Sequence, residues 1–473
     1  MSDSSTQSGK LPTSNFDVDL VRRYNGSGPR YTSYPTALQF TADFNAKQLR
    51  EVIDLSNEQL VPDPLSLYVH IPFCSKLCFY CACNKVITRN KNRAVDYLER
   101  LHEEISKYGK IFDDDRELVQ LHLGGGTPTF LETNQIDRLF SHIGDNFRLS
   151  KDLARDFSIE IDPRTVNIET LDCLREIGFT RISMGVQDFA PDVQKAIHRE
   201  QSSDETLALI AHAQAIGFAS TNVDLIYGLP LQTAAGFGKT LNQLLAVRPE
   251  RLSIFHYAHL PDRFKPQRKI CESQLPGSDE KLNILNGAIS QLTQAGYVHV
   301  GMDHFALVDD SLVSALQDGS LQRNFQGYST HARSDLIGVG VSAISHIGNS
   351  FSQNTKTLSI YQNHLDEGRM PIDQGLRLSQ DDILRKRVIE QLMCSTEVNL
   401  DKALKGFDCD AASYFADELR NLRPLEADRL IELTSPNVIK VTQKGRFFLR
   451  NICMIFDQYL SKKRDLNHYS KVI

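Results

Sequence analysis

The sequence predicts an α/β protein built on a parallel sheet, because strand-like and helix-like segments alternate between residues 65 and 261. Six segments are rich in β-branched and aromatic residues: 65–73, 118–126, 157–163, 181–188, 220–230 and 251–261. Helix-like stretches such as ETLALIAHAQAIG (205–217) lie between them. Repeated strand–helix units of this kind are typical of parallel α/β architectures.

Most of the strand-like segments end in polar, Gly or Pro residues, as in IPFC, GGGTPT, EIDPR, GVQD, DLIYGLP and YAHLP. In parallel barrels the active site is built at these carboxyl ends. Six units predict a partial barrel rather than a closed eight-stranded one. A doubly wound open sheet is the alternative, and periodicity alone does not separate the two.

The helix expected between the strand-like segments 65–73 and 118–126 shows a clear amphipathic pattern. Ala94, Leu98, Leu101, Ile105 and Tyr108 are spaced 4, 3, 4 and 3 residues apart, which places them on one helical face. A second helix is expected through QIDRLFSHIGDNF (135–147).

Beyond residue 300 the alternation weakens. YVHVGMDHFAL (297–307) is expected to form one further strand, and 323–350 reads as a loop-rich region with many Gly and Ser. From about 380 the chain becomes helical, and 438–460 predicts a strand, a Gly turn and a helix, like a small winged-helix module. We therefore expect a leader and arm (1–60), a catalytic region (61–375) and a helical, winged-helix-like C-terminal domain (376–473).

Composition excludes several classes of protein. The net charge of −6 and the lack of a concentrated basic helix argue against nucleic-acid binding. No stretch approaches the roughly 18 apolar residues of a membrane span. The N-terminal MSDSSTQSGKLPTSN has no apolar core, so it predicts a disordered leader rather than a secretory signal. We expect a cytoplasmic protein and, without coiled-coil heptads, a monomer.

Four of the nine cysteines crowd into CSKLCFYCACN (74–84), with the spacing Cys74-x3-Cys78-x2-Cys81-x-Cys83. Disulfides rarely persist in the cytoplasm, and structural zinc sites usually pair two separate cysteine or histidine knuckles. Only one knuckle is present here. Three thiolates on one loop can instead hold three irons of an iron–sulfur cluster and leave the fourth iron open.

Two further features point to a ligand site at the strand ends. GGGTPT (124–129) lets the backbone approach a ligand closely, although a tight turn is the alternative. Glu160, Gln187 and Asp224 end later strands and offer carboxylate and amide partners for a cation. Arg199 could pair with a carboxylate or be a surface charge.

The cysteine spacing, with Tyr80 before the last cluster cysteine, resembles the signature of radical S-adenosylmethionine (SAM) enzymes. That resemblance implies a [4Fe-4S] cluster whose open iron binds SAM and a 5′-deoxyadenosyl radical that abstracts hydrogen. It also implies a partial (β/α)6 TIM-like barrel, here with an N-terminal arm and a mostly α-helical C-terminal domain.

Nearly the whole chain is similar to oxygen-independent coproporphyrinogen III oxidases (dehydrogenases). The matching stretches include YNGSGPRYTSYPTALQF (24–40), LSLYVHIPFCSKLCFYCACNKVITR (65–89), TNVDLIYGLPLQT (221–233), RNFQGYST (323–330) and RNICMIFDQYL (450–460). The resemblance implies an oxidoreductase of heme biosynthesis. It would convert two propionates of coproporphyrinogen III to vinyls, giving protoporphyrinogen IX.

The resemblance also assigns residues. Cys74, Cys78 and Cys81 match the cluster ligands, and the family binds two SAM molecules. Positions matching contacts of the first SAM are Tyr68, Gly125, Glu160 and Ile344. Positions matching contacts of the second are Tyr80, Gly126, Thr127, Gln187, Arg199, Asp224 and Ala258. Tyr80 stands where some members have Phe.

The substrate carries four propionates, so we expect cations near it. Arg30 in GPRYTSYP and the basic run RFKPQRK (263–269) are the candidates, with a solvated surface as the alternative for the run. Cys83 is expected to act near the substrate or in electron flow, or else only to pack. An unidentified reductant and an electron acceptor complete the expected partners.

A radical-SAM-like heme chaperone is the competing function. Such relatives typically lack the fourth cysteine and the long N-terminal arm, and their heme-binding motif includes a tryptophan. This chain has Cys83 and contains no Trp, which favours the enzyme.

Overall fold

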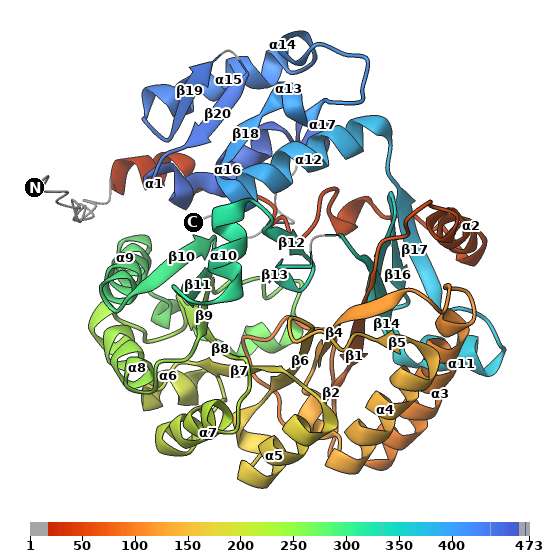
Figure 1. The fold of residues 1–473 in the computed structure, drawn as a ribbon. Helices are drawn as coiled ribbons and strands as arrows, with labels where there is room; N and C mark the ends of the chain where they lie inside the picture. The colour runs from red at the N-terminus through yellow and green to blue at the C-terminus, as the bar shows by residue number, and fades with distance from the viewer. Residues whose placement is uncertain (1–17, 332, 436, 463–468, 470–473) are drawn as a thin grey trace, which may run out of the picture.

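One curved sheet organises the part of the chain that this computed structural model describes, residues 18–331, 333–435, 437–462 and 469 (Figure 1). Its strand order is β10-β11-β9-β8-β7-β6-β4-β1-β14-β15-β16-β17. The leader expected from MSDSSTQSGKLPTSN lies outside the described residues. Among the described helices, none has the length and apolar composition needed to cross a membrane.

The six predicted strands form the centre of this sheet. They are β1 (Leu65–Ile71), β4 (Glu117–Gly125), β6 (Asp156–Ile161), β7 (Arg181–Gln187), β8 (Ser220–Tyr227) and β9 (Arg251–His256). Each pairs in parallel with the next, and each new strand adds to the same side. A doubly wound sheet would reverse that direction at a switch point, so the partial barrel is confirmed and the alternative is wrong.

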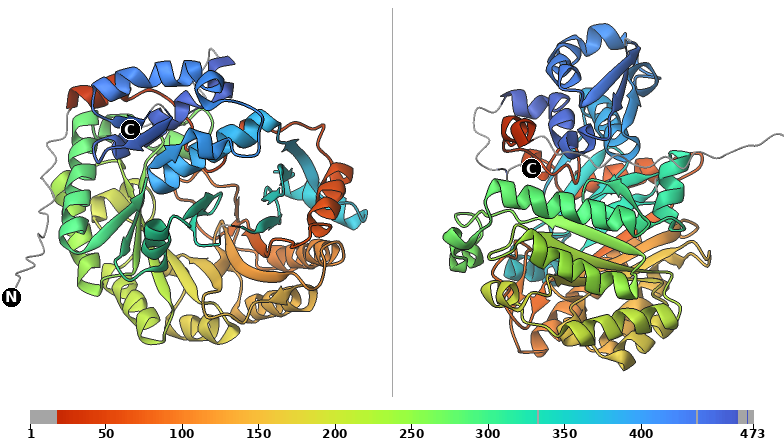
Figure 2. Two further views of the ribbon diagram at one scale, coloured as in Figure 1. Left: turned by 45° about the horizontal axis from the view of Figure 1, so that its top comes forward. Right: turned by 90° about the vertical axis from the view of Figure 1, so that its left-hand side faces the viewer.

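Helices cover the outside of the curved sheet (Figure 2, left). The crossover helices are α3 (Asn92–Gly109), α4 (Thr133–Asn146), α5 (Ile168–Ile177), α7 (Ser203–Ala215) and α8 (Ala234–Val247). All five apolar residues of the pattern predicted for α3 are buried, with Leu101, Ile105 and Tyr108 fully inaccessible. The outward-facing strand residues, such as Leu67 and Val69 of β1, are buried beneath such helices.

Antiparallel strands extend both edges. On one side β10 (Tyr297–Gly301) and β11 (His304–Leu307) form a hairpin beside β9. On the other, β14 (Asp335–Val339) pairs in parallel with β1. It is followed by antiparallel β15 (Ile344–Ile347), β16 (Ser350–Asn354) and β17 (Ile372–Arg377).

Two expectations are wrong in this region. The single strand expected at 297–307 is the β10–β11 hairpin. The region 323–350 is not mainly loop: it contains β14, β15 and the small hairpin of β12 (Gln322–Asn324) and β13 (Gly327–Ser329). Its glycines serve close packing. A Cβ on Gly338 would lie 2.4 Å from the Ile344 carbonyl oxygen, and one on Gly340 would lie 2.5 Å from the Tyr97 hydroxyl.

The C-terminal part forms a second core above the barrel (Figure 1). It contains α12 (Gln380–Ser395), α15 (Ala416–Ala427), α16 (Leu449–Ile455) and a three-stranded antiparallel sheet in the order β18-β20-β19 (Glu397–Asn399, Val438–Val441 and Ile431–Ser435). Leu20 and Val21 of α1 (Val18–Tyr24) and Tyr31 and Tyr34 of the arm share this core. The two ends of the chain are therefore packed together.

A buried carboxyl group joins the helices to the β14 edge of the sheet. Glu104 of α3 is fully buried and accepts three hydrogen bonds. The donors are the Gly340 amide at 2.8 Å, the Asn354 side-chain amide at 2.7 Å and the Tyr361 hydroxyl at 2.6 Å. The Asn354 amide nitrogen also donates to the Gly340 carbonyl oxygen at 2.8 Å, so it cannot turn without losing that bond.

We expect Glu104→Gln to lower the free energy of unfolding by about 2 kcal/mol, since either orientation of the new amide points an N–H group at an existing donor. Anaerobic urea denaturation measures the change. Glu103→Gln, at the exposed neighbouring position, is the matched control. Equal stabilities of the two variants would contradict this account of Glu104.

Candidate active site

The cysteine loop follows β1 and is closed by a short parallel pairing. β2 (Phe73–Cys74) pairs with β3 (Val86–Ile87), which brings the two ends of the loop together. Cys74, Cys78, Cys81 and Cys83 all line one cavity of about 260 Å³. The loop therefore presents its sulfurs to a common space at the carboxyl end of β1.

The arrangement of these sulfurs suits a cluster better than a single ion. Among the described residues, no three His, Cys, Asp or Glu side chains converge closely enough to hold one metal ion. An iron–sulfur cubane places each thiolate on a different iron, so its ligands need only border the same cavity. Donors already face two sulfurs: the Thr127 hydroxyl lies 3.4 Å from Cys74 Sγ, and two arginines reach Cys78.

Cys83 differs from the other three thiols. It is exposed at the rim of the cavity, and Lys85 Nζ donates to its carbonyl oxygen at 3.3 Å. A hydrogen bond from the Cys83 side chain lowers the pKa of Cys81 to about 6. Cys83 thus lies directly beside a predicted ligand.

The glycines after β4 are required by close contacts within the site. A Cβ on Gly126 would lie 2.7 Å from the Pro72 carbonyl oxygen, and one on Gly125 would lie 2.5 Å from the His70 ring. Gly125 also has a φ of +113°, which side chains disfavour. The Gly125 amide donates to Glu160 Oε2 at 3.1 Å. The glycine segment therefore lies flat against the cysteine loop, as a cradle for a ligand requires.

Two histidines that the sequence analysis did not single out organise the barrel interior. His70 Nε2 donates to the Asn84 carbonyl oxygen at 3.0 Å, so Nδ1 accepts from the Tyr68 hydroxyl at 3.0 Å. His122 stacks on Tyr68, with ring centroids 5.9 Å apart, and its Nε2 lies 3.3 Å from Glu160 Oε1. Every second residue of β1 and β4 faces this interior, which is the signal that could have found both.

Two carboxylates face the cavity in different environments. Burial opposes the charge of Glu160, but the hydrogen bond and charge of His122, the Gly125 amide and the charge of His70 together outweigh it and lower the pKa. For Asp224, burial and the charge of Glu160 raise the pKa to about 6. Ser183 and Asn222 donate to Asp224 at 2.9 and 2.8 Å. Such carboxylates can serve a sulfonium, an ammonium and hydroxyl groups together.

A buried ion network supports the cysteine loop. Arg199 is only 6% exposed, so it is not the surface charge offered as an alternative. Its Nη1 lies 3.2 Å from Asp162 Oδ2 and 3.5 Å from Cys78 Sγ, while Arg164 Nη2 lies 3.6 Å from the same sulfur. Burial disfavours the Asp162 charge, but Arg199 and Arg164 lower its pKa to about 2. Two guanidinium groups thus lie against Cys78 Sγ.

Gln187 reaches the cavity through a local irregularity. It has a φ of +68°, and the pairing of β7 with β8 shifts register between Gly185 and Gln187. Such bulges turn a side chain toward a site. A Cβ on Gly185 would lie 2.8 Å from Gln187 Nε2, so the glycine makes room for the amide.

The structure places most, but not all, of the predicted SAM-contacting residues around this cavity. The lining includes Tyr80, Gly125, Gly126, Thr127, Glu160, Gln187, Arg199 and Asp224. Tyr68 pairs with Gly338 of β14, against which the Ile344 backbone packs, so Tyr68 and Ile344 lie together at the β1–β14 edge. Ala258 lines a second cavity. Buried Gln267, which the sequence analysis missed, donates to the carbonyl oxygens of Ala258 and Tyr80 and so ties the two cavities together.

Arg30 and the basic run 263–269, the two candidates for cations near the substrate, differ in position. Four of the residues in 263–269 are cations, and all four are exposed, in agreement with a solvated surface. Arg30 instead points inward, and its Nη2 donates to the His256 carbonyl oxygen at 2.7 Å. It is not among the residues that line the cysteine cavity.

The residues present suit an iron–sulfur cluster and SAM. The three predicted ligand cysteines and Cys83 border the cavity, glycine backbone lies close enough to approach a ligand, and carboxylate, amide and guanidinium groups face the same space. Cluster ligation requires the thiolates, and SAM combines cationic and anionic groups that require partners of both charges.

Comparison with known proteins gives matches over almost the full length. Residues 68–244 match the radical SAM superfamily model, and 378–448 match the HemN C-terminal domain model. Curated oxygen-independent coproporphyrinogen III oxidases from Pseudomonas aeruginosa and Escherichia coli are each 47% identical to this chain. The alignments cover 98% and 97% of it and 100% and 98% of those proteins.

A solved structure supports the same family assignment. Coproporphyrinogen III oxidase (HemN) from Escherichia coli, described as a radical SAM enzyme, matches with a TM-score of 0.89 and 46% identity. The match covers 94% of this chain and 99% of that one. The chain therefore belongs to the oxygen-independent coproporphyrinogen III oxidase family of the radical SAM superfamily.

Proposed function

We propose that this protein catalyses the oxygen-independent oxidative decarboxylation of coproporphyrinogen III. Two propionate side chains become vinyl groups, giving protoporphyrinogen IX. The observation that supports this most strongly is the 47% identity to curated oxidases over 98% of the chain. The cysteine loop, the glycine segment and the polar interior belong to that same alignment.

The chain's own residues bind and orient the reactants. Cys74, Cys78 and Cys81 hold the [4Fe-4S] cluster, and the lining of the cysteine cavity binds SAM, with two molecules bound in all. When bound, these cofactors supply a 5′-deoxyadenosyl radical that removes one hydrogen atom from each reacting propionate, which then loses CO₂ and one electron. The protein around these cofactors binds and orients the substrate and keeps water and oxygen from the reacting groups.

The remaining expectations extend this proposal. All nine cysteines are free thiols, which supports a reducing compartment, and we propose a cytoplasmic monomer. A one-electron reductant and a separate electron acceptor complete the reaction. We retain 1–60, 61–375 and 376–473 as the arm, the catalytic region and the C-terminal domain.

An anaerobic assay with coproporphyrinogen III, SAM and a one-electron reductant tests the function. We expect protoporphyrinogen IX and 5′-deoxyadenosine, both followed by mass spectrometry, and no product when SAM is omitted. Cleavage of SAM without loss of CO₂ from the substrate would contradict the proposed reaction.

Substituting any cluster ligand is expected to abolish the cluster. Cys74→Ser, Cys78→Ser and Cys81→Ser each remove a thiolate that the irons require. Bound iron and sulfide and the electron paramagnetic resonance (EPR) spectrum of the reduced protein measure the loss. Cys271→Ser, at an exposed thiol outside the site, is the control. A full cluster in one of the three variants would remove that residue from the ligand set.

Cys83→Ala is expected to keep its cluster, because three ligands remain and Cys83 lies at the rim of the cavity. Iron content equal to that of the unmodified protein supports the division into three ligands and one further thiol. Iron content as low as in Cys81→Ser would make Cys83 a ligand. Turnover by the same variant separates a chemical role for Cys83 from a packing role.

A further inference from the structure

Charged side chains from four distant parts of the chain meet at the edge of the barrel. They are Arg30 of the arm, Asp303 of the β10–β11 turn, Arg323 of β12 and Arg450 of α16. We call these four residues the seam cluster. Arginine stays protonated in proteins, so the cluster has an excess of positive charge.

Several N–H groups of the seam cluster have no acceptor among the residues that the structure describes. Arg450 Nη2 lies 3.7 Å from Asp303 Oδ2. Within the described part of the chain, however, Arg450 Nη1 and Arg323 Nε and Nη1 are buried without a hydrogen-bond partner. Arg450 is only 8% exposed. Buried donors are normally satisfied, so these guanidinium groups indicate a site for an anion.

Electrostatic effects show that the cations act on one another. Burial lowers the pKa of Arg30, Arg450 lowers it further, and Asp303 partly opposes them. Burial and then Arg323 lower the pKa of His304 to about 3, so this imidazole stays neutral and adds no charge. One carboxylate does not neutralise three cations, and a bound anion would relieve their repulsion.

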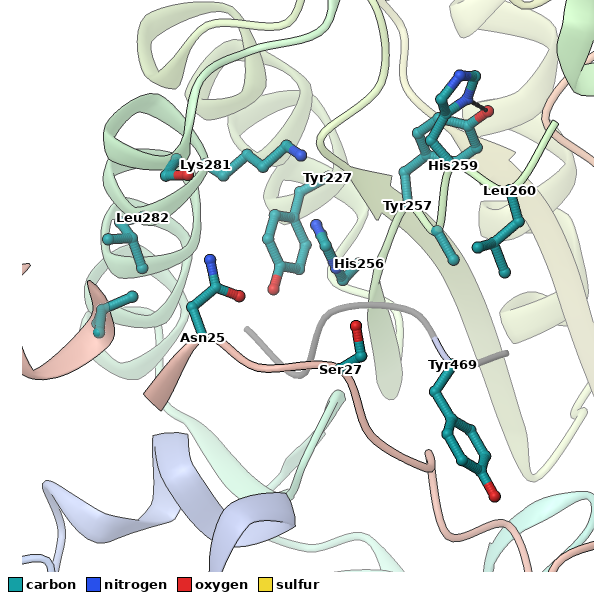
Figure 3. A pocket seen from close by; sticks show the side chains of 13 residues that line it. Asn25, Ser27, Tyr227, His256, Tyr257, His259, Leu260, Lys281, Leu282 and Tyr469 are labelled. Atoms are coloured by element: carbon teal, nitrogen blue, oxygen red, sulfur yellow. Dashed lines mark hydrogen bonds between the residues drawn. The ribbon is translucent and has the colours of Figure 1, made fainter. Parts of the chain in front are cut away.

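Open space adjoins the seam cluster. A cavity of about 320 Å³ lies between the arm and the ends of β8 and β9, and Figure 3 shows Tyr227 and His256 projecting into it, with Asn25 of the arm alongside. A smaller cavity of about 50 Å³ is lined by Asp303 and Arg450. Tyr227 lines both cavities, so they are neighbours.

We propose that the seam cluster binds propionate carboxylates of the substrate that do not react. This inference rests on the proposed function. Coproporphyrinogen III has four propionates and only two are converted, so two carboxylates stay anionic through both reactions. The planar fork of a guanidinium matches a carboxylate in geometry and charge. The seam cluster thus holds the macrocycle by groups that persist from substrate to product.

The seam cluster is separate from the groups facing the cysteine cavity. Four cationic residues line that cavity: Lys76, Lys85, Arg164 and Arg199. Both arginines are already bonded to Asp162, and Arg199 also donates to the Gly185 carbonyl oxygen. None of the four seam residues lines the cysteine cavity. A carboxylate bound at the seam therefore leaves the predicted SAM-binding groups in place.

Fluorescence titration of the anaerobic, cluster-loaded full-length protein with coproporphyrin III tests the proposal. This stable porphyrin carries all four propionates, and its tetra-amide carries none. Arg323→Gln should weaken binding of coproporphyrin III about tenfold or more and leave binding of the tetra-amide unchanged. Arg323→Lys should recover part of the affinity. Lys265→Gln removes the same charge from the exposed run and should have no effect.

The seam site would be overturned if Arg323→Gln weakened the binding of both ligands equally or weakened the binding of neither. It would also be overturned if the unmodified protein bound coproporphyrin III no better than the tetra-amide. Iron content and the EPR spectrum check that the variant is folded; if Arg323→Gln loses its cluster, Arg30→Gln provides the same contrast. The anaerobic turnover assay with coproporphyrinogen III, SAM and a one-electron reductant is run in parallel on the unmodified protein. If the unmodified protein binds the porphyrin through its carboxylates but forms no protoporphyrinogen, the proposed function is refuted and the seam site stands. If it forms protoporphyrinogen but Arg323→Gln binds coproporphyrin III with unchanged affinity, the seam site is refuted and the proposed function stands.

Discussion

The alternation of side chains along the six parallel strands is the constraint on which the rest of the structure depends. One set of residues packs against the outer helices and is apolar, as Leu67 and Val69 show. The other set faces the barrel interior and is polar, including Tyr68, His122 and Asp224. Polar groups in such a place must bond to one another or to a ligand. The hydrogen bonds among them fix the side chains before any ligand binds, which is the preorganisation that catalysis needs.

Much of this architecture is predictable from local patterns, and the exceptions have a physical cause. Strand and helix periodicity identified the six central strands and the buried face of α3, because burial imposes those periods directly. It failed at β14, because Gly338 in the strand and Gly340 directly after it are residues typical of loops. Those glycines are there because Ile344 and Tyr97 lie against them. Such contacts join segments that are distant in sequence, and no local pattern records them.

The site, too, combines features that a local pattern reveals with contacts between segments distant in sequence. Four cysteines on one loop are visible as a motif, because their spacing alone brings the sulfurs together. Arg164 and Arg199 have no such signature, yet both lie within 3.6 Å of Cys78 Sγ. Their importance comes from charge: thiolates and a cluster concentrate negative charge, and the guanidinium groups of half-buried Arg164 and buried Arg199 offset it. Hydrogen bonds to ligand sulfurs are also a means of tuning cluster potentials.

The seam cluster gives the C-terminal domain and the arm a role beyond packing. Arg30 and Arg450 come from opposite ends of the chain, and both ends share one apolar core. That core holds the two guanidinium groups in position over the barrel edge. Of the four seam residues, the barrel region supplies only Arg323 and Asp303, one cation and one anion, so their net charge is zero. Only when both termini dock does the charge become strongly positive, so the ability to bind a polyanionic substrate depends on folding of the whole chain.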